Sequence, residues 1–206
     1  MNKIQIDNKI ITITHDKDNY NFHQEDNHKV YNVEKGAYLR VYHYNFDCNS
    51  SIEINLNSEN ANVEYHYSTI NYGNHNLKMV VNHNKKNTTS NIYNHGVNIL
   101  NDKLHFYVEG IVKKDIEGCI CNQENQIINL KDGNSTILQI LLIDNYNVTS
   151  SHSAYIGKFK EDIIFYLMSR GIRKEQAIKL LISSLLINGG EEQQELINFK
   201  NKIENI

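Results

Sequence analysis

His152 is the residue whose surroundings best suit chemistry, because it lies among small side chains in the stretch Ser150-Ser-His-Ser-Ala154. No large neighbour would enclose its ring, so the imidazole could meet a metal ion or a partner protein. A neutral imidazole binds borderline transition metals and can transfer a proton near pH 7. A surface or capping histidine at a corner between a strand and a helix would have the same neighbours, so both interpretations stay open.

The second candidate is Cys119-Ile-Cys121, a pair of cysteines separated by one residue. Residues i and i+2 of a strand point to the same face, so two thiolates here could share a soft metal or carry a persulfide. The spacing favours a metal site only weakly, because no second pair of ligands accompanies it. Inward positions of a strand are also where cysteines are buried as small apolar side chains, and this alternative is retained.

Composition restricts the classes of function. The 206-residue chain has 21 Lys and Arg, 24 Asp and Glu, and a formal charge of -3, which argues against nucleic acid or an anionic membrane as a partner. No segment reaches the roughly 20 apolar residues of a membrane-spanning helix, and no signal peptide is expected. Three cysteines make no disulfide framework, so we expect a reducing, cytoplasmic location.

Motifs for catalysis are also missing from the sequence. No glycine loop of the phosphate-binding type is found, so the chain is not expected to hydrolyse a nucleotide. No nucleophile elbow and no pair of catalytic carboxylates stands out either. We therefore expect a protein that is not an enzyme.

The elements that must position these residues begin with strands. From Lys3 to about Val148 apolar and polar residues alternate, which predicts strands with one buried face. His43 and His66 lie between tyrosines in this region, and we expect both to face outward. The spacing fits a sandwich, a barrel or a β-solenoid. One central inward residue per strand recurs at intervals of 11, 14, 13, 14 and 14, namely Ile54, Tyr65, Met79, Ile92, Phe106 and Ile120.

After Gly157 the apolar residues follow a helical period instead. A short helix that ends at Gly171 is predicted first, with Ile163, Ile164, Leu167 and Met168 on one face. A second helix is predicted from about Arg173 to Ile187, with an apolar stripe wide enough to be covered on more than one face.

The tail from Glu191 to Ile206 is charged and has only a thin apolar stripe, made of Leu196, Phe199 and Ile203. This pattern predicts a helix. Because the stripe is thin and the segment is terminal, we expect the helix to be solvated.

The corner between strand and helix carries a family resemblance. Ser151-His-Ser-Ala-Tyr-Ile-Gly157, followed by Phe165-Tyr-Leu-Met-Ser-Arg-Gly-Ile172 and Glu175-Gln-Ala177, resembles the SufB/SufD family of scaffold proteins for iron-sulfur cluster assembly. The resemblance is dense from about Glu124 to Leu186. It implies a mainly β protein, with a right-handed parallel β-helix over residues 1-158 and a small C-terminal helical domain over 159-206. Family members commonly carry a further helical region before the β-helix, and we expect a short member without it.

The resemblance also implies roles for individual residues. His152 stands at the position of a functionally important histidine of SufD-type members, where it would be a ligand for iron or for a cluster under assembly. Phe165, Tyr166, Arg170 and Gly171 would belong to the surface that docks a SufC-type ATPase. The alternative is that Phe165 and Tyr166 pack against the last coil, while Arg170 interacts with the carboxyl end of its own helix.

The implied partners are a SufC-type ATPase and a SufB-type scaffold chain or a second identical chain. No tightly bound cofactor is expected, although iron or an iron-sulfur cluster could be held transiently. SufB-type members carry a sulfur-accepting cysteine on a strand upstream of the corner, and the resemblance places Gly133 there. The chain is therefore expected to be SufD-like, unless Cys119 or Cys121 replaces that cysteine.

Two alternatives to a scaffold remain. A structural β-solenoid could associate with itself, end to end, without cluster chemistry. A carbohydrate-active β-helix enzyme would carry clustered acidic residues on one face, and the sequence shows no such cluster.

Overall fold

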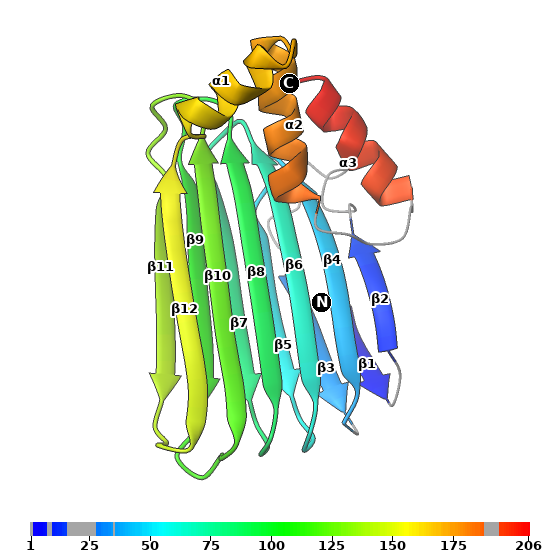
Figure 1. Cartoon of the computed structure of the whole chain (residues 1–206). Helices are drawn as coiled ribbons and strands as arrows, with labels where there is room; N and C mark the ends of the chain where they lie inside the picture. The colour runs from blue at the N-terminus through cyan, green and yellow to red at the C-terminus, as the bar shows by residue number, and fades with distance from the viewer. Residues whose placement is uncertain (1, 8–9, 16–27, 35, 188–193) are drawn as a thin grey trace.

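The described residues form two parallel six-stranded sheets that face each other (Figure 1). The computed structural model describes residues 2–7, 10–15, 28–34, 36–187 and 194–206. The first sheet has the order β1 (Asn2–Asp7), β3 (His28–Glu34), β5 (Ser50–Leu56), β7 (His75–His83), β9 (Leu104–Val112) and β11 (Thr136–Ile143). The second has the order β2 (Ile10–His15), β4 (Tyr38–Phe46), β6 (Asn62–Asn71), β8 (Thr89–Asn98), β10 (Cys119–Asn129) and β12 (Val148–Gly157).

Successive strands alternate between the two sheets, so each strand pairs in parallel with the strand two places further along the chain. The chain thus coils from the first strands to β12, and the coil is right-handed in Figure 1. This is the expected right-handed parallel β-helix, and the prediction is confirmed. In such a solenoid each coil buries its apolar face by stacking on its neighbours.

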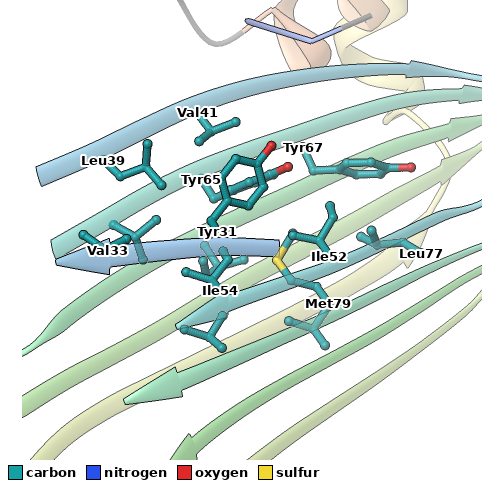
Figure 2. Packing of buried hydrophobic residues seen from close by; sticks show 14 of the residues in the cluster. Tyr31, Val33, Leu39, Val41, Ile52, Ile54, Tyr65, Tyr67, Leu77 and Met79 are labelled. Carbon is teal, nitrogen blue, oxygen red and sulfur yellow. The ribbon is translucent and has the colours of Figure 1, made fainter. Parts of the chain in front are cut away.

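The core lies between the sheets and is made of inward side chains from both (Figure 2). Five of the six predicted inward residues are at most 1% exposed: Ile54, Tyr65, Met79, Ile92 and Phe106. Each such side chain contributes about 1.5–3 kcal/mol when fully buried. The sixth prediction is wrong, because Ile120 is 38% exposed and points outward while Cys119 and Cys121 point inward.

The two histidines between tyrosines differ in direction. His66 faces outward as predicted, with its ring stacked between Tyr42 at 5.0 Å and Tyr93 at 4.8 Å. The prediction for His43 is wrong, since this side chain is fully buried and its Nδ1 lies 2.9 Å from the Tyr65 hydroxyl. A buried hydroxyl supplies the partner that lets a histidine occupy an inward position.

In the described residues after the last strand there are three helices, α1 (Glu161–Ser169), α2 (Lys174–Leu186) and α3 (Gln194–Glu204). The predicted end of the first helix at Gly171 lies within two residues of the end of α1. The predicted start and end of the second helix each lie within one residue of those of α2. α2 and α3 lie against the outer face of the second sheet, over its upper part in Figure 1. None of the described helices is long and apolar enough to cross a membrane.

The prediction of a solvated tail helix is wrong. Leu196, Phe199 and Ile203 are at most 3% exposed, and the Phe199 ring lies 5.0 Å from that of Tyr44. The reason lies in the sheet: near their carboxyl ends, strands such as β4, β6 and β8 are buried on both faces. An apolar patch on the outer face of the sheet therefore exists for even a thin stripe to cover.

Candidate functional site at the open end of the solenoid

The solenoid ends in two edge strands, β11 in the first sheet and β12 in the second. Each has one neighbouring strand within the described chain, so no strand pairs with its other side. A side chain makes one contact there, because the Gln139 amide on β11 donates to the Ser153 carbonyl on β12 at 2.7 Å. Apolar side chains are exposed on both strands: Leu138 by 47%, Leu142 by 50% and Ile156 by 41%. An exposed edge with apolar side chains is a site at which another chain can add.

His152 lies in the middle of β12 and is exposed, so no large neighbour encloses its ring, as predicted. In the register between β10 and β12 it is paired with Gln123. Register partners in a parallel pair share one face of the sheet, and Gln123 points into the interior. The histidine therefore belongs to the inward-facing row of the open last coil, where a partner chain can reach it.

Three amide side chains lie in the interior behind this histidine. Gln123, Asn125 and Asn94 are at most 3% exposed, and the Asn94 Nδ2 donates to the Asn125 Oδ1 at 2.7 Å. His152 and Gln123 line a common hollow of about 290 Å³, together with residues of β8 and other residues of β10 and β12.

Sequence reasoning did not single out these amides, although a signal was present. Gln123 and Asn125 continue the alternation of Cys119 and Cys121, which places two polar residues at inward positions. A polar residue at an inward position of a strand is the informative departure from the pattern.

The two cysteines are buried in the core, each 1% exposed. Burial raises the pKa of the Cys121 thiol, and a hydrogen bond with Ser90 only partly offsets this effect. A thiol with a raised pKa is protonated at neutral pH and is a poor nucleophile and metal ligand. In the described part of the chain no three His, Cys, Asp or Glu side chains come together to hold a metal ion.

A polar network involving His83 adjoins the cysteines. The His83 Nδ1 lies 2.8 Å from the Thr88 hydroxyl, and its Nε2 lies 2.9 Å from the Ser90 hydroxyl. The Thr88 hydroxyl is in turn 3.3 Å from the Cys119 sulfur. Burial lowers the pKa of His83 to about 4, so the ring is neutral at pH 7. The interior around the cysteines therefore holds uncharged polar groups.

The predicted docking residues are on or next to α1, which has no buried residue. Phe165 is 66% exposed and Tyr166 is 57% exposed, which contradicts the alternative that both pack against the last coil. The Arg170 guanidinium lies 5.4 Å above the Tyr166 ring. Gly171 has a φ of +86°, a conformation that favours glycine and ends the helix.

A hollow of about 380 Å³ separates α1 from α2 and from the end of β10. Its apolar lining includes Phe159, Ile164, Phe165, Met168 and Ile178. α2 is fixed to the second sheet at its carboxyl end, where the Ser68 hydroxyl donates to the Leu186 carbonyl at 2.7 Å. The helical region therefore combines an anchored helix with an exposed apolar one.

The expectation that Gly133 occupies a strand is wrong. This residue lies in the turn between β10 and β11. A side chain added there would meet the Asn98 Nδ2 at 2.5 Å. Gly133 is thus explained by the close approach of this asparagine, and it does not mark a strand position that a cysteine has vacated.

Comparison with known proteins gives one consistent result. A family model for the SufBD core domain of SUF-system iron-sulfur cluster assembly matches residues 8–185. The chain is 36% identical over 98 residues to the "Iron-sulfur cluster assembly protein SufD" of Bacillus subtilis, which covers 46% of this chain and 22% of that protein. It is 35% identical over 101 residues to the "Iron-sulfur cluster assembly SufBD family protein ycf24" of Galdieria sulphuraria, and this match covers 48% of this chain and 45% of that protein. The match thus spans less than half the length of either relative.

Proposed function

Because the chain belongs to the SufBD family of the SUF iron-sulfur cluster assembly system, we propose that it is a non-catalytic scaffold subunit. Its 36% identity over 98 residues to the SufD protein of Bacillus subtilis supports a SufD-like rather than a SufB-like member. The observation that carries the proposal is His152, exposed on the edge strand of the family's β-helix core. Iron and sulfide are the cargo of such a scaffold. The role of the protein is to present ligands to them and to hold the partners in place.

The first proposed partner is a second scaffold chain, either of the SufB type or an identical copy. It pairs with the exposed backbone of β11 and β12. Support comes from the exposed apolar side chains Leu138, Leu142 and Ile156 on these strands, which a partner would cover. The pairing would also enclose His152 between two chains, so that ligands from both reach the same iron.

The second proposed partner is a SufC-type ATPase, which docks on α1. An exposed aromatic pair, Phe165 and Tyr166, next to an arginine is typical of the residues that dominate protein interfaces. The hollow of about 380 Å³ beside Phe165 offers a place for an apolar side chain of the ATPase. Movement of the ATPase would shift the helical region and the scaffold chains, which exposes His152 to iron.

The test is an anaerobic pull-down of the chain with the SufC-type and SufB-type proteins of the same cell, followed by measurement of mass and iron content. A stoichiometric complex is expected. Phe165→Glu should release the ATPase, whereas Ile120→Glu should not, since Ile120 is also exposed but lies at the start of β10, far along the strand from the helices. Retention of neither protein would refute the scaffold function.

An alternative function is a structural solenoid that associates with itself through the same open end. It predicts fibres in electron microscopy and no affinity for an ATPase. Cluster assembly separates the two functions: His152→Ala should abolish it in a complementation assay if the scaffold proposal is correct, and an unchanged level would count against the role of His152.

A further inference from the structure

The buried amides behind His152 lower the stability of the fold, because several of their polar atoms are unpaired. The Gln123 Nε2 and Oε1, the Asn125 Nδ2 and the Asn94 Oδ1 make no hydrogen bond to any described residue. Leaving a buried polar group without a partner costs about 1–3 kcal/mol, and native proteins contain few such groups. An apolar residue at position 123 would avoid this cost. The presence of glutamine therefore calls for an explanation other than stability.

Gln123 is the amide nearest to His152 in the sheet. The two residues are register partners on β10 and β12, so their backbones are about 4.8 Å apart and their side chains share one face. Both residues also line the hollow of about 290 Å³.

Space for the Gln123 amide is provided across the interior by Gly110. A β-carbon at Gly110 would lie 3.0 Å from the Gln123 Nε2 and 2.6 Å from the Cys121 sulfur. The glutamine is thus accommodated by a residue without a side chain on the facing sheet.

We propose that Gln123 is a positioning residue for iron binding at His152, through a hydrogen bond from the imidazole to the Gln123 amide oxygen. When iron binds one ring nitrogen, the other carries a proton that needs an acceptor. Such a partner fixes the tautomer and orientation of a metal-binding histidine, and its loss typically costs 10–100-fold in metal affinity. The inference rests on the proposed function, because it assumes that His152 binds iron.

The test compares Fe(II) binding by the full 206-residue chain in complex with the second scaffold chain, in anaerobic equilibrium dialysis, with the thermal midpoint of unfolding of the chain alone as a second readout. Gln123→Leu is expected to weaken Fe(II) binding about 10–100-fold while the thermal midpoint stays unchanged or rises. Gln126→Leu is the matched control, since Gln126 is on the same strand but on the outer face, and it should bind Fe(II) like the wild type. Gln123→Glu keeps an acceptor and should retain more affinity than Gln123→Leu.

The outcomes separate the inference from the function on which it rests. If His152→Ala loses Fe(II) binding but Gln123→Leu does not, the positioning role is refuted and the scaffold function stands. If His152→Ala binds Fe(II) normally, both the iron role of His152 and the inference are refuted. If Gln123→Leu lowers the thermal midpoint together with affinity, and the length-conserving Gln123→Met does the same, Gln123 is structural and the inference is wrong.

Discussion

Acid should destabilise the protein through His83, the buried histidine beside the cysteines. Burial lowers its pKa from 6.5 to about 4 in the folded chain. A group whose folded pKa is depressed stabilises the fold when it is neutral, so this contribution is complete above pH 6.5 and is lost as the pH falls towards 4. Each pH unit in that window costs about 1.4 kcal/mol. At pH 5, about 1.5 units below the unfolded pKa, the loss is therefore about 2 kcal/mol.

Urea unfolding at pH 7.5 and at pH 5.0 measures this loss directly. His83→Gln cannot acquire the charge and keeps groups that can hydrogen-bond to Thr88 and Ser90, so the drop in unfolding free energy between the two pH values should be smaller than in the wild type by about 2 kcal/mol. His152→Gln is the matched control, because His152 is exposed, and it should keep the full pH dependence. A pH dependence of His83→Gln equal to that of the wild type would refute the assignment to this residue.

Two further predictions concern burial. Phe199→Ala removes a fully buried ring from the contact between α3 and the second sheet and should cost about 3–5 kcal/mol in chemical denaturation. Ile197→Ala, on the same helix but 39% exposed, should cost far less, and equal effects would mean that α3 does not dock as described. For the thiols, native labelling with iodoacetamide should modify Cys48, which is partly exposed, and spare Cys119 and Cys121 until the chain is unfolded. Early modification of either buried cysteine would contradict the core positions assigned to them.

The sequence is sufficient to predict the solenoid because two independent signals agree. Period-two alternation identified the inward residues Ile54 and Phe106, and the family resemblance selected the parallel β-helix from the folds compatible with that spacing. The helix after Gly157 was predicted from the change to a helical period, and the exposure of His152 from its small neighbours. Family residues and periodicity both belong to short stretches of the chain, so neither depends on contacts between distant segments.

What the sequence does not reveal depends on contacts between distant segments. The burial of α3 requires an apolar patch on the outer face of the sheet, and that patch is visible only when Tyr44, Ile70 and Val97 are seen to lie side by side. His43 is inward because a tyrosine on the next strand, Tyr65, provides a hydroxyl partner. Neither the contact of α3 with the sheet nor that of His43 with Tyr65 could be assigned from spacing along the chain.

One inward row of the second sheet shows how the interior changes along the solenoid. Register places Val41 beside Tyr65, Tyr65 beside Ile92, Ile92 beside Gln123 and Gln123 beside His152. Val41, Tyr65 and Ile92 are at most 1% exposed and pack in the hydrophobic core, so in the early coils this row stabilises the fold. The last two are polar, and the side-chain amide of Gln123 has no hydrogen-bond partner among the described residues. Because consistent apolar choices stabilise a fold and departures concentrate at functional sites, the change within one row supports the open end as the functional site of the proposed scaffold.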